Sequence, residues 1–239
     1  MKLIDENITE TFDEHYLIET LNLNDKVILE LGCGDAAKTK QIAQTGFNRK
    51  IIAYEIDEIQ HNKNVKTHFE NIQFVLGAAE DIKLEDNSVD IVFMFKSFHH
   101  IQKEFMPNAL NEIKRVLKPN GLAYISEPLF YGDQNYLISL FHDEQQVRID
   151  AFEAIKNSVN NNQFKLFKEI FFQTEVNYES FEDFEKKQIN LSYISHSMEE
   201  QLHTKIKSEY TRLSNMDGKA SFLKPFRVDI LQKIDDYKS

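Results

Sequence analysis

An apolar run closes on an acid and a glycine turn in the stretch Val27-Ile28-Leu29-Glu30-Leu31-Gly32-Cys33-Gly34-Asp35-Ala36-Ala37. This pattern predicts a buried strand that leads through a tight turn into a helix, so that bare backbone and a helix N-terminus face a ligand. A second apolar run, Ile51-Ile52-Ala53-Tyr54, ends in Glu55. Nucleotide-binding folds place the carboxylate that holds ribose hydroxyls at this position. The two runs together indicate a nucleotide-type pocket.

Two classes of ligand fit such a turn. Gly32, Gly34 and Ala37 satisfy the loose G-x-G-x-x-G/A pattern of dinucleotide sites. A pyrophosphate in that turn would lie between the like charges of Glu30 and Asp35, which lowers its affinity. A cationic ligand gains from the same two carboxylates. The charges therefore favour a cation over a dinucleotide.

The sequence resembles the class I S-adenosylmethionine-dependent methyltransferases, in particular the small-molecule branch that includes the quinone and sterol methyltransferases. The resemblance covers roughly residues 8 to 130 and recurs near the C-terminus. In this family an acid precedes G-x-G-x-G, which Glu30, Gly32 and Gly34 match, while Ala36 replaces the third glycine. Cys33 fills the first variable position, where a small packing residue is expected.

Further family motifs follow in order. Glu55 stands at the position of the ribose-binding acid, and Ile56 at that of the residue packed on adenine. The run 77–80, Gly-Ala-Ala-Glu, resembles the Gly-Asp-Ala-Glu that reads the adenine edge, so Glu80 or Asp81 must replace the missing acid if the adenine amine is to be bound. The resemblance implies a cofactor site for S-adenosylmethionine made of Glu30, Gly32, Cys33, Gly34, Glu55, Ile56, Ala78, Ala79, Glu80 and Lys96.

The alternation of strands and helices predicts an α/β fold with a Rossmann-like, doubly wound sheet. Strands are expected at 26–30, 50–55, 72–76, 89–95 and 121–126, and helices at 10–21, 36–44, 58–70 and 105–117. The Lys118-Pro119-Asn120-Gly121 turn, a specific family signature, should stop the last of these helices.

After Pro128 the pattern becomes helical over roughly 134–156, and 164–176 and 220–231 are expected as the sixth and seventh strands. Ser197-x-x-Glu200 predicts a capping box for a helix that continues to about Leu213. The sheet should thus have seven strands, mainly parallel with an antiparallel last strand, and helices on both faces. We expect one domain over 1–239, with an N-terminal helical cover (1–24), a cofactor-binding core (25–128) and a substrate-side region (129–239). Within the last region, 178–215 is expected either to cover the substrate or to serve as a packing or dimer contact.

The composition fits a soluble enzyme. The chain of 239 residues carries a formal net charge of −11, which argues against a broad surface for nucleic acid or anionic membrane. No apolar run approaches the ~20 residues of a membrane span, and the N-terminus is acidic. The single cysteine, Cys33, excludes an intramolecular disulfide and fits a cytoplasmic location. The expected partners are a small-molecule acceptor and a second copy in a homodimer.

The candidates for catalysis lie at the carboxyl ends of the fourth and fifth strands, where open α/β sheets place ligands. They are His99, His100 and Glu127. These three residues also suggest a metal site, but adjacent histidines on an extended segment point to opposite sides. No metal is therefore expected.

The predicted function is methyl transfer from S-adenosylmethionine to a small organic acceptor. The first alternative is a catalytically inactive or regulatory protein that binds the same cofactor, which the departures at Ala36 and Ala78 favour. Another chemistry with this cofactor or a derivative is a second alternative. A nicotinamide-dependent oxidoreductase is the last, disfavoured by Glu30 and Asp35.

Overall fold

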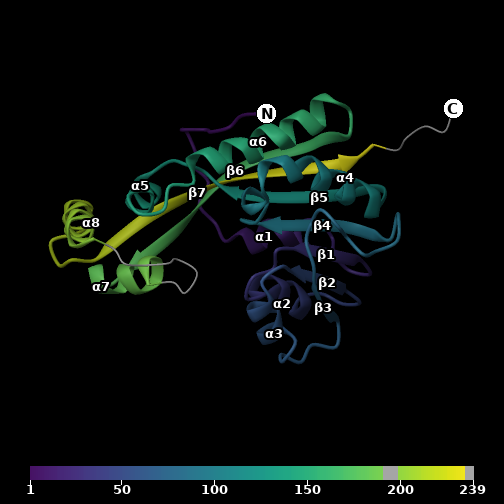
Figure 1. The fold of residues 1–239 in the computed structure, drawn as a ribbon, viewed down its shortest axis with the longest axis horizontal. Coiled ribbons are helices and arrows are strands. Elements are labelled where there is room, and N and C mark those ends of the chain that lie inside the picture. Colours follow the sequence, from purple (N-terminus) through teal and green to yellow (C-terminus); the bar gives the residue numbers. More distant parts are fainter. Residues whose placement is uncertain (191–198, 235–239) are drawn as a thin grey trace.

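A seven-stranded sheet in the order β3-β2-β1-β4-β5-β7-β6 forms the centre of the molecule (Figure 1). The computed structural model describes residues 1–190 and 199–234. Its strands are β1 (Val27–Leu31), β2 (Lys50–Glu55), β3 (Ile72–Leu76), β4 (Val89–Phe95), β5 (Leu117–Pro128), β6 (Phe164–Tyr178) and β7 (Ala220–Lys233). The first five strands pair in parallel, and β7 pairs antiparallel with both β5 and β6. The predicted Rossmann-like fold is confirmed.

Helices pack on both faces of this sheet and at the outer end of its last two strands. The α-helices of the described residues are α1 (Glu14–Glu19), α2 (Ala37–Gln44), α3 (Glu58–Asn64), α4 (Met106–Val116), α5 (Asp133–Ser139), α6 (Gln145–Asn160), α7 (Phe181–Phe184) and α8 (Glu200–Leu213). On one face Ile113 of α4 and Ile155 of α6 join a buried cluster with Leu29 of β1. On the other face Ile18 of α1 and Ile42 of α2 pack with the neighbouring strand residue Ile28. The alternation of side chains along a strand supplies both cores.

Local sequence explains where several helices begin. The Asp57 carboxylate accepts hydrogen bonds from the amides of Ile59 and Gln60 and thereby caps α3. Asp13 caps α1 in the same way through the His15 amide. Helix α1 is shorter than predicted because the chain before it pairs with β6, where the Gln173 amide donates to the Glu10 carbonyl at 2.9 Å. These caps fix how the chain enters α1 and α3.

The single helical stretch predicted over 134–156 is wrong, because the chain forms two helices there. A turn after Ser139 separates α5 from α6. Asp143 accepts a hydrogen bond from the Gln145 amide at 2.9 Å, and Glu144 occupies the N-cap position of α6. Local side-chain bonding of this kind competes with a continuous helix. The break turns Glu144 toward the carboxyl ends of β4 and β5.

The β6–β7 hairpin extends well beyond the other strands and carries α5, α7 and α8 at its outer end (Figure 1). An aromatic cluster fills this outer lobe, with Tyr178, Phe184, Tyr210 and Phe222 buried at its centre. Helix α8 begins at Glu200, with Glu199 at its cap position. Ser197 of the predicted capping box lies outside the described residues. No helix in the described part of the chain has the length and apolar character needed to cross a bilayer.

Candidate functional site

The glycine turn lies between β1 and α2, at the carboxyl edge of the parallel strands. The amides of Gly32 and Cys33 both donate to the Tyr54 carbonyl, at 3.0 and 2.9 Å, which joins the turn to β2. Gly32, Gly34 and Ala36 all have positive φ, at 71°, 54° and 59°. Ala36 therefore takes the left-handed conformation that a glycine adopts more readily, and the turn keeps its course despite the departure from the family pattern.

The space around the two glycines differs. A Cβ atom added at Gly32 would lie 2.7 Å from Cβ of Ser97, whose hydroxyl donates to the Leu31 carbonyl at 2.8 Å. A Cβ atom added at Gly34 would meet nothing within 4 Å. Gly32 thus provides a close approach between β1 and the end of β4, while open space lies over Gly34. This arrangement fits the backbone cradle of a nucleotide-type ligand.

The Glu55 carboxylate spans the turn from the end of β2. It accepts hydrogen bonds from the amides of Gly34, at 2.6 Å, and Asp57, at 2.9 Å. Asn64 of α3 donates to the Gly34 carbonyl at 2.7 Å and holds the same turn. The sequence motifs did not single out Asn64, because its role depends on how α3 packs on β2 and β3. Glu55 thus lies at the edge of the open space over Gly34, where it was expected.

The expected adenine-side residues follow β2 and β3. Ile56 is 69% exposed, an unusual environment for a large aliphatic side chain and one that a flat aromatic ligand would cover. The Gly77 amide donates to the Glu55 carbonyl at 3.0 Å and brings the half-buried Ala78, Ala79 and Glu80 beside the end of β2. Strands β2 and β3 therefore place Ile56 and the run 77–80 at the same edge of the sheet.

Glu30 is buried on β1, and its carboxylate accepts a hydrogen bond from the Thr39 hydroxyl at 2.6 Å. Burial raises the pKa of Glu30 to about 8, and the nearby charge of Asp35 acts in the same direction. Burial also raises the pKa of the Cys33 thiol. Cys33 packs with Ala36 and Ala53, which confirms its expected packing and makes a nucleophilic role unfavourable.

The raised pKa of Glu30 gives a prediction for stability. The unfolded chain has lost the proton of Glu30 above about pH 5, whereas the folded chain keeps it up to about pH 8. The free energy of unfolding should therefore fall as pH rises between these values. The side chain of Glu30→Gln cannot ionise. The free energy of unfolding of this variant should therefore lack a fall on the order of 3 kcal/mol that the parent shows between pH 5 and 8. Urea unfolding of both proteins from pH 5 to 8 measures it. If the free energies of unfolding of the two proteins changed equally with pH, the pKa of Glu30 would not be raised in the folded chain.

The candidate catalytic residues meet at the ends of β4 and β5. His99 Nδ1 forms a short hydrogen bond with Oε2 of Glu127, and Oε1 of Glu127 accepts from the Phe98 amide at 3.0 Å. On the other side of the ring, His99 Nε2 lies 3.6 Å from Oε1 of Glu144. No sequence motif pointed to Glu144, which reaches this site from the N-cap position of α6. His99 is therefore held between two carboxylates and is almost fully buried.

The two histidines have different electrostatic environments. Burial opposes the charge of His99, but Glu127 and Glu144 outweigh it and raise the pKa of His99 to about 9. Burial and the charge of His99 lower the pKa of His100. Lys96 precedes them with a positive φ of 53°, and its amide donates to the Ser126 carbonyl at 2.8 Å. His99 and Glu127 thus form a fixed ion pair, and His100 lies beside it with one side covered by the protein and the rest exposed.

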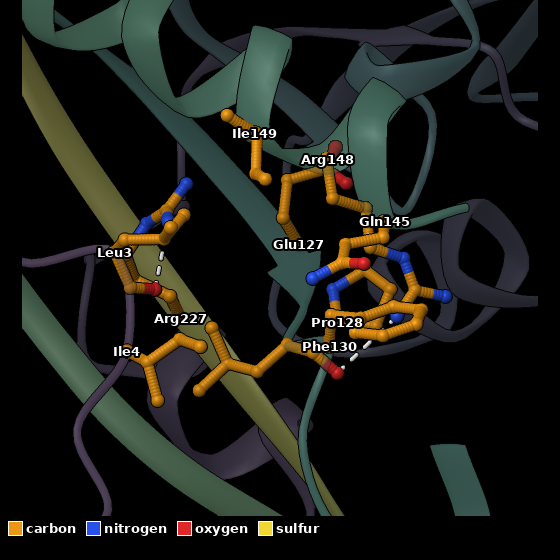
Figure 2. A pocket seen from close by; sticks show the side chains of 10 residues that line it. Leu3, Ile4, Glu127, Pro128, Phe130, Gln145, Arg148, Ile149 and Arg227 are labelled. Atoms are coloured by element: carbon orange, nitrogen blue, oxygen red, sulfur yellow. Dashed lines mark hydrogen bonds between the residues drawn. The ribbon is translucent and has the colours of Figure 1, made fainter. Parts of the chain in front are cut away.

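A mostly apolar cavity opens next to this ion pair (Figure 2). Its polar side chains come from Glu127, Gln145, Arg148 and Arg227. The remaining walls are Leu3, Ile4, Pro128, Leu129, Phe130 and Ile149. Arg227 is buried and pairs with Asp229 at 2.8 Å, and it also donates to the Leu3 carbonyl at 3.3 Å. Apolar walls with a few fixed polar groups are typical of small-molecule sites.

The fold and this edge define a class of protein: a Rossmann-like methyltransferase fold with a nucleotide-type cradle at the ends of β1 and β2. Residues 29–125 match the family described as the methyltransferase domain. This part of the chain is thus similar to methyltransferase domains.

Curated relatives and solved structures agree with this similarity. A sterol 24-C-methyltransferase of Gibberella zeae is 29% identical over 154 residues, which cover 60% of this chain and 38% of that protein. An uncharacterised methyltransferase-like protein of Schizosaccharomyces pombe is 35% identical over 114 residues, 48% of this chain and 41% of its own length. The chain thus spans about two fifths of these relatives.

The similarity in fold extends over nearly the whole chain. The YcgJ protein from Bacillus subtilis has a TM-score of 0.66 at 16% identity, covering 93% of this chain and 98% of that one. A putative methyltransferase from Bacillus halodurans has a TM-score of 0.65 at 15% identity, covering 93% and 99%. The fold therefore includes the last two strands, which lie beyond the matched residues 29–125.

Proposed function

We propose that this protein transfers a methyl group from S-adenosylmethionine to a small organic molecule. The observation that carries the proposal is that one edge of the sheet holds both halves of a site. The glycine turn and Glu55 lie on one side of it, and the His99–Glu127 pair with its apolar cavity lies on the other. Relatives named as sterol and phosphoethanolamine methyltransferases support a small acceptor.

The cofactor fits the residues present at the first half. Glu55 would hold the ribose hydroxyls, Ile56 would pack on adenine, and the backbone of Gly32 to Gly34 would face the amino acid portion. The Asp35 carboxylate favours its positive charge. The proposed cofactor-binding site is completed by Cys33, Ala78, Ala79, Glu80 and Lys96. When bound, S-adenosylmethionine supplies an electrophilic methyl carbon on a sulfonium.

The second half would orient the acceptor and exclude water, which can account for much of the rate of an in-line transfer. We propose that His99, His100 and Glu127 form the acceptor side. His99 and Glu127 act as one rigid wall because their hydrogen bonds to each other and to the Phe98 amide fix both side chains. The cavity beside them offers apolar surface to the acceptor (Figure 2).

Turnover tests this proposal directly. Purified protein is incubated with S-adenosylmethionine and pools of small acceptors, and S-adenosylhomocysteine and products heavier by one CH₂ group are followed by mass spectrometry. We expect acceptor-dependent formation of both, and no formation with Glu55→Lys. Tight cofactor binding without turnover across phenols, amines, thiols and activated carbon acids would favour the inactive, regulatory alternative.

The proposed function also carries a proposed location of the protein in the cell and a proposed domain organisation of the chain. We propose a cytoplasmic enzyme whose residues 1–239 form one domain with three parts, 1–24, 25–128 and 129–239, the last of which covers the acceptor. The single, buried cysteine agrees with a reducing compartment. The exposed Phe167 and Leu223 would be covered in the homodimer that we propose.

A further inference from the structure

Two histidines and a glutamate converge at the end of β4. The sequence pattern predicted an extended segment at His99 and His100. In the structure they lie on a 3₁₀ turn, Phe98–His100, and their rings lie side by side with centroids 4.1 Å apart. The turn is closed by the His100 amide, which donates to the Ser97 carbonyl at 3.2 Å. The geometric reason for excluding a metal therefore does not hold.

We propose that His99, His100 and Glu144 bind a divalent transition-metal ion. One ligand atom from each residue can be chosen so that all three lie within 4.8 Å of one another. A tetrahedral zinc site with bonds of about 2.0–2.1 Å requires ligand atoms about 3.3 Å apart. His99 Nε2 and Glu144 Oε1 are 3.6 Å apart, so one edge of such a site is already formed. His100 is exposed and can turn to close the rest.

The groups around these ligands are arranged as in metal sites. Glu127 accepts a hydrogen bond from Nδ1 of His99, which leaves Nε2 directed at Glu144. The metal ion would replace the proton on Nε2, and this proton would be released to solvent on binding. Arg148 binds the other oxygen of Glu144, Oε2, at 2.5 Å, which fixes the carboxylate and leaves Oε1 on the side of the histidines. Each proposed ligand except His100 is thus oriented by a second residue.

A further imidazole lies within reach. Nε2 of His142, in the turn between α5 and α6, is 3.0 Å from Oε1 of Glu144. Imidazole nitrogens with one carboxylate suit zinc, cobalt, nickel and iron(II), whereas magnesium and calcium prefer oxygen ligands. The ion would connect the end of β4 to the N-terminus of α6, next to the cavity that Glu127 and Arg148 line.

Metal titration of the full chain, without cofactor or acceptor, tests the proposal separately from methyl transfer. Chelator-treated protein is titrated with Zn²⁺ by calorimetry and with Co²⁺ by visible absorption. We expect one equivalent of each to bind with a dissociation constant in the micromolar range or below, the absorption of nitrogen- and oxygen-bound Co²⁺, and a higher melting temperature with Zn²⁺.

Two variants and a control assign the site. His100→Ala, an exposed position, should weaken Zn²⁺ binding at least 30-fold, and Glu144→Gln should do the same. His68→Ala, an exposed histidine on the loop before β3, should bind as the parent does. Circular dichroism checks that each variant is folded. Absence of stoichiometric binding to the parent, or parental affinity in folded His100→Ala, would overturn the proposal.

Discussion

Glu55→Lys is expected to reduce the affinity for S-adenosylhomocysteine by roughly 100-fold or more. Hydrogen bonds to a charged group contribute about 1.5–3 kcal/mol each, and 1.4 kcal/mol corresponds to a tenfold change in affinity. The variant removes the carboxylate that lies at the edge of the open space over Gly34 and that accepts from the Gly34 and Asp57 amides. Calorimetric titration of parent and variant measures the change.

Two further variants make this result specific. Glu55→Gln keeps the shape of the side chain and should lose roughly tenfold, so it tests the site if the lysine disturbs the turn. Glu70→Lys makes the same change of charge at an exposed position before β3 and should leave the affinity unchanged. Parental affinity in both Glu55 variants would show that Glu55 does not bind the cofactor.

Gly32→Ala is expected to lower the free energy of unfolding by about 2–5 kcal/mol. Two costs add: the left-handed backbone, about 1–2 kcal/mol for a residue with Cβ, and overpacking, typically about 1–3 kcal/mol. The overpacking arises because the new methyl would lie 2.7 Å from Cβ of Ser97. Urea unfolding at constant pH gives the value.

Gly34→Ala separates the two costs. Gly34 also has a positive φ, but its added Cβ meets nothing within 4 Å, so only the backbone cost of about 1–2 kcal/mol remains. We therefore expect Gly32→Ala to be the less stable of the two. Equal losses would show that Ser97 moves away without cost and that the close approach of β1 and β4 is unimportant.

Four strands of the parallel sheet, β1 to β4, were predicted to within a residue, whereas β5 begins at Leu117 and ends at Pro128 instead of spanning 121–126. The apolar runs that end in Glu55, Leu76 and Phe95 are bounded by polar turns, and a buried parallel strand needs just such a run. The proposed cofactor-side residues lie near or just after the carboxyl ends of these strands. Local sequence was therefore enough to predict where they lie on the sheet.

The acceptor side could not be predicted in the same way. Glu144 meets His99 only because α6 begins anew after the turn that follows α5 and then packs near the end of β4. The turn at His99 and His100 depends on Glu127, 29 residues after Phe98, whose carboxylate accepts from the Phe98 amide. Contacts across such separations leave no periodic signal in the sequence.

The most direct test of the account is a calorimetric titration of ligand-free parent protein with S-adenosylmethionine, S-adenosylhomocysteine and NADH. We expect binding of both sulfur ligands with micromolar or lower dissociation constants and no binding of NADH, because the Asp35 carboxylate disfavours a pyrophosphate at the turn. Folded protein that binds NADH, or that binds neither sulfur ligand, would contradict the account.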